Sequence, residues 1–240
     1  AFLRLAVALG DRVLRFVAGW QGIAVEALGA ALGVAAAYVV RGLIMTLLFP
    51  AARGGSLLLL AFAVSLDSAG LGAMAGGITL LVARFLAPMP RPGEQLMAWR
   101  WASALAVGFL LGLAAGIPYE AAYASNLMVS PPALLGRYGV GGLLMGTGIA
   151  VGWIVMCRRP VIGASVGAAL AGLVIGGLDV LTGHPWLPNL TPQGADLWRM
   201  LQAGLSGGLT GFGLIGGWTW GSRLWTRWQA QQAGVLFKDE

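Results

Sequence analysis

The residues of this sequence that could do chemistry are the few charged side chains that interrupt long apolar runs. Arg41 and Asp67 lie deep in such runs, and Glu26 lies nearer the start of one. A charged side chain in the middle of a membrane costs about 2.5–3.5 kcal/mol on insertion scales, so it needs a partner or a function. We therefore interpret Arg41 and Asp67 as either a gating or substrate-binding pair, or an ion pair that only neutralises itself.

Three other polar residues are candidates for contact with a substrate or ion. Glu26 would either contribute to gating or reach the lipid headgroups, where Arg12 or Arg15 could pair with it. Glu120 and Asn126 would either line an outer vestibule or belong to a solvated loop. None of the three is expected to catalyse.

Catalytic and metal-binding patterns are missing from the sequence. It has no phosphate-binding glycine loop, no zinc-binding HExxH and no pair of carboxylates at helical spacing. A single cysteine and a single histidine exclude multi-cysteine and two-histidine metal sites within one chain. We expect no catalytic residues, no metal and no cofactor, and the residues identify no family.

Composition places the chain in a membrane. It is 58% hydrophobic and only 10% charged, with a mean hydropathy of +0.80, whereas soluble domains are about 25% charged. The net charge of +6 comes from basic residues scattered singly between apolar runs, which is typical of membrane flanks and not of a nucleic-acid interface. These features predict an all-α, polytopic bundle of transmembrane helices.

The apolar runs predict about six spans. The run 56–87 exceeds the length that a bilayer needs, so we expect it to tilt strongly or to break near 68–70. The first span has two possible registers, 16–40 or 23–49, and we favour the second. The other spans are predicted at 56–87, 101–117, 139–157, 161–178 and 198–221.

The favoured register gives Asp67 a partner. A turn over 50–55 makes the first two spans antiparallel. Arg41 precedes this turn and Asp67 follows it at similar distances along the chain, so their depths differ by about 5 Å. We therefore expect the two charges to meet across the hairpin.

Basic residues indicate the orientation. Eleven of the fifteen Lys and Arg residues fall on the side that holds both termini, the 84–100 loop and the 158–159 turn. The positive-inside rule therefore predicts cytoplasmic termini in the inner (plasma) membrane, with segments 118–138 and 179–197 outside. Arg84 counts here as a loop residue, and Trp99 and Trp153 are interpreted as anchors at helix ends.

The two ends of the chain differ from the bundle, which we assign to residues 18–223. Residues 1–17 form an amphipathic pattern with a basic edge, which predicts either an interfacial helix on anionic lipids or the first turns of a long span. Residues 224–240 are expected to be a cytoplasmic tail.

Small residues repeat at four-residue spacing in every predicted span. Such pairs let helix backbones approach within the chain, in a homo-oligomer or against other membrane subunits. The stretches 141–159 and 207–223 also resemble each other, and 75–84 ends similarly, so the bundle is interpreted as three related hairpins, unless glycine-rich sequence simply aligns with itself. The glycines are Gly29/Gly33, Gly72/Gly76, Gly108/Gly112/Gly116, Gly142/Gly146, Gly163/Gly167 and Gly213/Gly217/Gly221.

Two functions are consistent with these patterns. Intramembrane charges and glycine-rich helices favour a transporter or channel subunit for a small solute or ion. The missing motifs and the small-residue surfaces favour a non-transporting subunit that scaffolds a larger membrane complex. A polar cavity that reaches the buried charges would support the first function, and a dry Gly/Ala-packed interior would support the second.

Overall fold

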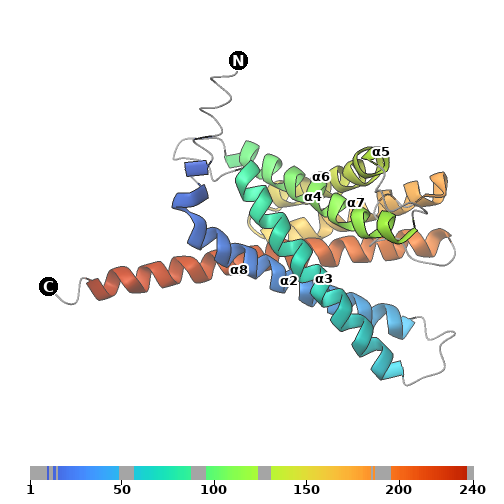
Figure 1. The fold of residues 1–240 in the computed structure, drawn as a ribbon, viewed down its shortest axis with the longest axis horizontal. Coiled ribbons are helices and arrows are strands. Elements are labelled where there is room, and N and C mark those ends of the chain that lie inside the picture. The colour runs from blue at the N-terminus through green and yellow to red at the C-terminus, as the bar shows by residue number, and fades with distance from the viewer. Residues whose placement is uncertain are drawn as a thin grey trace, which may run out of the picture.

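A computed structural model shows an all-helical protein, in agreement with the class predicted from composition (Figure 1). It describes residues 10, 13–14, 16–48, 57–87, 96–123, 131–184, 186 and 196–236. Within these helices, the side chains of residues 45–48, 57–68, 71–72, 115, 118–123, 133, 196 and 233–236 lie outside the described part. No strand occurs among the residues it describes.

Six long helices and two short ones make up the described chain. In chain order they are α2 (Trp20–Leu48), α3 (Leu57–Leu86), α4 (Leu96–Tyr123), α5 (Pro131–Ala133), the π-helix η1 (Leu134–Gly139), α6 (Val140–Val155), α7 (Pro160–Thr182) and α8 (Asp196–Leu236).

Four helical segments of the described chain are long and apolar enough to cross a membrane. They are Trp20–Ile44, Leu96–Ala114, Leu134–Val155 and Pro160–Thr182. The described part of α3 contributes a shorter apolar stretch, Ala73–Leu86. The protein is therefore a membrane protein by length and composition of its helices, whereas the predicted number of six spans is not confirmed.

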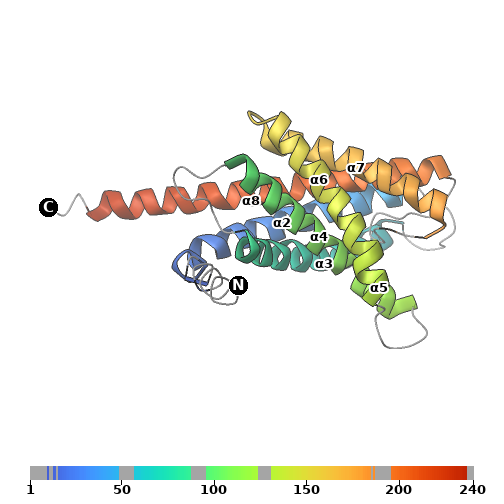
Figure 2. The ribbon, with the colours of Figure 1, turned by 90° about the horizontal axis from the view of Figure 1, so that it is seen from above.

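The long helices pack in the order α3, α2, α8, α7, α6, α4, and a smaller contact joins α4 to α3. Helix α8 lies between α2 and α7 and runs past the other helices toward the C-terminus (Figures 1 and 2). The contact between α3 and α4 is the smallest of these, so the ring of helices is completed by the few side chains that lie between α3 and α4.

Glycines allow the close helix contacts that the sequence predicted. A Cβ at Gly33 of α2 would collide with the carbonyl oxygen of Gly213 in α8. The same holds for Gly108 against Gly142 where α4 meets α6. Helices in lipid associate through such backbone approach, because no hydrophobic force drives them together.

The structure corrects two boundaries. Helix α3 runs unbroken from Leu57 to Leu86, so of the two alternatives predicted for this run, a strong tilt or a break near 68–70, the break is absent. The segment 118–138 is helical at both ends, because α4 continues to Tyr123 and the chain is helical again from Pro131. Tyr138 of η1 is fully buried and packs where Gly116 leaves room beside α4.

Candidate functional site

A buried ion pair joins α2 to α3 at the end of the bundle where α3 ends. The guanidinium of Arg84 donates from Nε to Glu26 Oε2 at 2.8 Å, and its Nη2 donates to the same oxygen. Both residues are buried, at 3% and 6% exposure. Removing one partner of such a pair costs about 3–5 kcal/mol, because the remaining charge is left buried without compensation.

Helix α8 supplies a third member of this site. Ser222 Oγ donates to Glu26 Oε1 at 2.5 Å, so both carboxylate oxygens of Glu26 are bound. A Cβ at Gly221 would press on the carbonyl oxygen of Val25 and the Cα of Glu26. The glycine therefore lets α8 approach α2 closely enough for Ser222 to reach the carboxylate.

Two tryptophans pack against the guanidinium of Arg84, and a third packs against their rings. Its Cζ lies 5.3 Å from the ring centroid of Trp99 in α4 and 4.9 Å from that of Trp218 in α8. Trp153 of α6 packs edge-on against both rings, with centroids 6.1 Å from Trp99 and 5.2 Å from Trp218. A desolvated cation over an indole ring gains roughly 2 kcal/mol, so these rings help to hold the buried charge.

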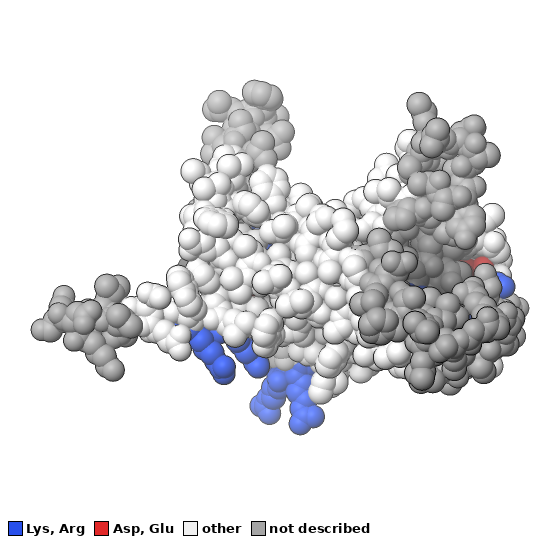
Figure 3. Space-filling model, turned by 60° about the horizontal axis from the view of Figure 1, so that its bottom comes forward, with Lys and Arg blue, Asp and Glu red and all other residues white. Residues whose placement is uncertain are grey.

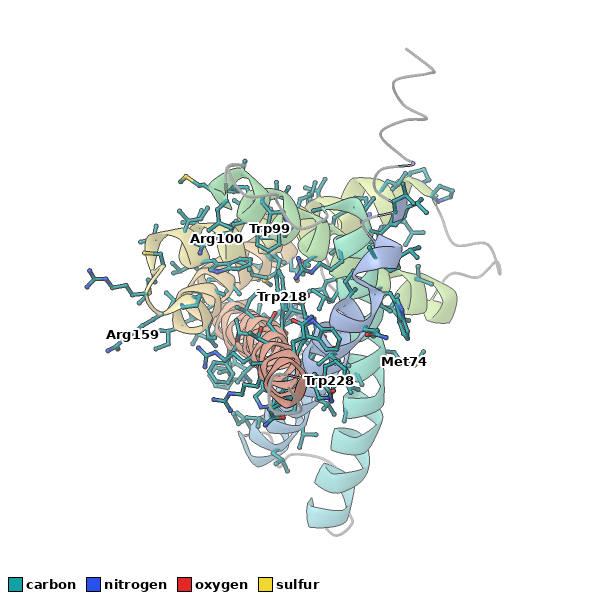
Figure 4. All side chains as sticks on the ribbon, turned by 90° about the vertical axis from the view of Figure 1, so that its left-hand side faces the viewer. Met74, Trp99, Arg100, Arg159, Trp218 and Trp228 are labelled. Carbon is teal, nitrogen blue, oxygen red and sulfur yellow. The ribbon has the colours of Figure 1, made fainter. Side chains whose placement is uncertain are left out.

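The tryptophan triad, defined as Trp99, Trp153 and Trp218, closes this end of the bundle. Figure 4 shows Trp99 and Trp218 side by side between the helices. Trp99 Nε1 donates to the carbonyl oxygen of Ala87 at 3.2 Å, which fixes the start of α4 against the end of α3. On the outer side, the Cζ of Arg100 lies 5.5 Å from the ring centroid of Trp153. The ion pair and triad thus connect α2, α3, α4, α6 and α8.

A cavity of about 470 Å³ opens onto the ion pair. A Cβ at Gly22 would strike the ring of Trp225, so this glycine gives the indole its place in the cavity wall. Aromatic and polar side chains line the space together, which is typical of a site that binds a small molecule. The lining residues are Phe16, Gly19, Gly22, Ile23, Glu26, Arg84, Ser222, Trp225, Thr226 and Gln229.

More buried polar side chains follow α8 away from this site. Gln202, Ser206 and Thr210 are each at most 6% exposed and occur at four-residue steps. Continued in the same steps, the row passes through Leu214 and Trp218 to Ser222. Twenty residues of helix rise about 30 Å, which is the thickness of a bilayer core, although a row at this spacing winds around the helix.

Of the five residues predicted as candidates, Glu26 lies in the site. The predicted reach to the headgroups is wrong, because Glu26 is buried and pairs with Arg84; the alternative, pairing with Arg12 or Arg15, is not tested. Arg12 and Arg15 themselves lie outside the described residues.

Of the other four candidates, the structure describes the side chain of Arg41 alone, and it lies outside this site. Arg41 is half-buried in α2, which continues past it to Leu48, and its Cζ lies 5.9 Å from the ring centroid of Tyr38. The side chains of Asp67 and Glu120, and all of Asn126, lie outside the described part. The pairing of Arg41 with Asp67 therefore stays a prediction.

Sequence reasoning missed most of the site. It assigned Arg84 to a loop and Trp99 and Trp153 to headgroup anchoring, whereas Arg84 and Trp153 are buried in the bundle. The resemblance between 141–159 and 207–223 contained a signal, since it places Gly152-Trp153 beside Gly217-Trp218. The similar stretch 75–84 ends at Arg84, so the three similar segments converge on one cluster.

A second buried acid, Asp179 of α7, lies elsewhere in the bundle. It is 4% exposed and accepts a hydrogen bond from the backbone N–H of Trp186 at 2.7 Å. Sequence reasoning placed Asp179 at the start of an external loop, whereas α7 continues beyond it to Thr182.

Comparisons with known proteins provide no relative for this arrangement. The chain matches no protein-family model, and no curated protein or solved structure is significantly similar to it. No group of three or more His, Cys, Asp or Glu side chains that could hold a metal occurs in the described part.

Proposed function

We propose that the chain is a transporter or channel subunit that moves a small solute or ion, with Glu26 and Arg84 as its gate. The observation that carries this proposal is the cavity that opens onto a buried ion pair in a bundle of mainly apolar helices. Buried ionisable groups inside membrane helices commonly mark a substrate or ion pathway. The row of buried polar groups on α8 supplies hydrogen-bonding partners deeper in the bundle.

In this proposal the ion pair and the tryptophan triad work together. Glu26 and Arg84 neutralise each other while the pathway is closed. The tryptophan triad then blocks the pathway next to Arg84. A solute that binds Glu26 or Arg84 competes with the pair and loosens the contact between α3 and α4, which is the smallest contact between neighbouring long helices of the described chain. The Glu26–Arg84 pair and the small contact between α3 and α4 thus form one element that can move.

The proposed topology has six crossings with both termini in the cytoplasm of a bacterial-type inner membrane. The described basic residues support this orientation, because Arg84, Arg100, Arg158 and Arg159 occur near helix ends on the side of the triad, and Arg223 and Arg227 follow Trp218 on α8. A reporter enzyme that is active only outside the cytoplasm, fused after Glu240, should stay inactive. Strong activity would contradict the orientation.

Transport is tested with purified protein in sealed liposomes. Stopped-flow light scattering is measured with urea, glycerol and small amino acids, and ion-sensitive dyes report K⁺, Na⁺, Cl⁻ and H⁺ flux. We expect one solute class to move faster than in empty liposomes, and Glu26→Gln to abolish this increase. Arg137→Gln, a change in η1 outside the site, is the matched control and should leave the flux unchanged.

A scaffold function is the second candidate, and one observation favours it. An apolar groove of about 570 Å³ lies between α7 and α8, with Ser165, Ala169, Gly204 and Gly208 among its small lining residues. Grooves lined by small residues suit the close approach of another transmembrane helix. If no solute moves, and a partner subunit co-purifies in mild detergent and is lost in Gly208→Leu, the scaffold function replaces the transporter.

A further inference from the structure

Four exposed arginines from two distant parts of the sequence lie at the same end of the bundle. Arg158 and Arg159 form the turn between α6 and α7, and Arg223 and Arg227 lie on α8. None of the four forms an ion pair or hydrogen bond with another described side chain. Figure 3 shows Lys and Arg side chains gathered in one region of this face, beside the projecting end of α8.

Helix packing explains why the two pairs meet. A Cβ at Gly216 would lie 3.5 Å from Val161 Cγ1, so α8 passes directly beside the start of α7. Seven residues make nearly two turns, so Arg223 continues the face of Gly216 and Arg227 follows one turn later. Arg158 and Arg159 immediately precede α7, and Figure 4 shows Arg159 pointing away from the bundle.

No acidic side chain that the structure describes pairs with this basic patch, defined as Arg158, Arg159, Arg223 and Arg227. Glu26 and Asp179 are the acidic residues whose side chains the structure describes. Glu26 is buried and bound by Arg84 and Ser222, and Asp179 lies near the opposite end of α7. The patch therefore presents four positive charges to its surroundings.

An apolar surface begins directly beside the patch. Ile162, Val166, Leu170 and Val174 are 44–59% exposed and form a row at four-residue steps along α7. Val155, the last residue of α6, is 74% exposed. Arginines at one end of a lipid-facing apolar row lie where phosphate headgroups join their acyl chains.

We propose that the basic patch binds the phosphate headgroup of an anionic phospholipid whose acyl chains lie along the exposed row of α7. The adjoining apolar row favours a lipid over a free phosphate or an acidic soluble partner, because neither of these needs an apolar surface. Trp220 and Trp228, which are 52% and 49% exposed on the same stretch of α8, suit the headgroup region. This site is separate from the Glu26–Arg84 cavity and does not depend on transport.

The native Cys157 provides a local probe, since it is exposed, adjoins Arg158 and is the single cysteine of the chain. A neutral fluorophore is attached to it, and the protein is reconstituted in mixtures of phosphatidylglycerol and phosphatidylcholine. In each mixture one of the two lipids carries a spin label that quenches the fluorophore. The ratio of quenching gives the relative affinity of the two lipids for the site.

We expect phosphatidylglycerol to quench more strongly than phosphatidylcholine at equal concentration. Each arginine near an anionic lipid contributes roughly a five-fold preference, so single Arg→Gln changes should reduce the ratio by up to that factor. The four-fold Gln variant should show no preference. Arg137→Gln should keep the wild-type ratio, and a fluorophore on Leu181→Cys in a Cys157→Ser background should report no preference at the opposite end of α7.

Three results would overturn the proposal. One is equal quenching by both lipids in the wild-type protein. Another is a preference that persists in the four-fold variant, provided that this variant elutes as a single folded species. The third is loss of the preference on addition of inorganic phosphate at constant ionic strength, which would identify a site for free phosphate instead.

Discussion

Arg84 lies over the indole ring of Trp218, with its Cζ 4.9 Å from the ring centroid, while the same guanidinium binds Glu26. One side chain of α3 therefore contacts both α2 and α8, and Trp99 adds α4. The contact between α3 and α4 is otherwise small. Arg84 is therefore a main link from α2 and α3 to α4.

Breaking the Glu26–Arg84 pair should destabilise the protein more than replacing it. Glu26→Gln and Arg84→Gln each leave the other partner buried, which costs about 3–5 kcal/mol when the remaining charge loses its partner. The double change Glu26→Leu with Arg84→Met should recover most of the lost stability, because apolar replacement of a buried pair is often near neutral. Thermal unfolding in detergent, followed by size-exclusion chromatography, measures both effects.

The double variant also separates structure from function. In the proposed mechanism it is folded but moves no solute. A folded double variant with wild-type flux would show that the pair is only structural and would remove the gate from the proposal.

Trp218 should contribute to stability through its contacts and not through its position in the membrane. Trp218→Leu loses the cation–π contact with Arg84 and two edge-on ring contacts, so we expect a loss of about 2–4 kcal/mol. Trp218→Phe keeps an aromatic face and should lose less. Trp220→Leu is the matched control, since Trp220 lies two residues after Trp218, is 52% exposed and should change unfolding by less than about 0.5 kcal/mol. Equal melting temperatures for the two leucine variants would refute the role of the triad.

Two glycine-to-alanine changes should have opposite signs. Gly33→Ala places a methyl group against the backbone of Gly213, so we expect a loss of about 1–3 kcal/mol as α2 and α8 are forced apart. Gly70→Ala meets nothing within 4 Å and lies inside α3, so it should be neutral or stabilise by up to about 1 kcal/mol. Chemical or thermal unfolding of the two purified variants provides the comparison, and similar losses for both would argue against close packing at Gly33.

The predicted pairing of Arg41 with Asp67 is tested by the same logic. Arg41→Ala and Asp67→Ala should each lower the yield of folded protein sharply, and Arg41→Leu with Asp67→Leu should restore much of it. Additive losses in the double variant would mean that the two charges do not interact. Flux through a folded double variant then shows whether this pair functions or only neutralises itself.

The sequence by itself determined the class of this protein. A charge content of 10% and long apolar runs predict membrane-spanning segments. Such segments fold as helices, because lipid cannot form hydrogen bonds with exposed backbone polar groups. Glycines at four-residue spacing also predicted close helix contacts, since this spacing puts small residues on one side of a helix. These conclusions depend on local composition and spacing, which a sequence states directly.

Only the tertiary structure decided which charges meet. Glu26 and Arg84 are 58 residues apart, and Ser222 is 196 residues from Glu26. Arg84 resembles an ordinary basic flank in sequence because it is followed by a proline-containing polar segment, and only the packing of α2, α4 and α8 around it buries it. Depth along a single helix can be counted from the chain, but the neighbour of that helix and the direction in which a side chain points depend on how all the helices pack together.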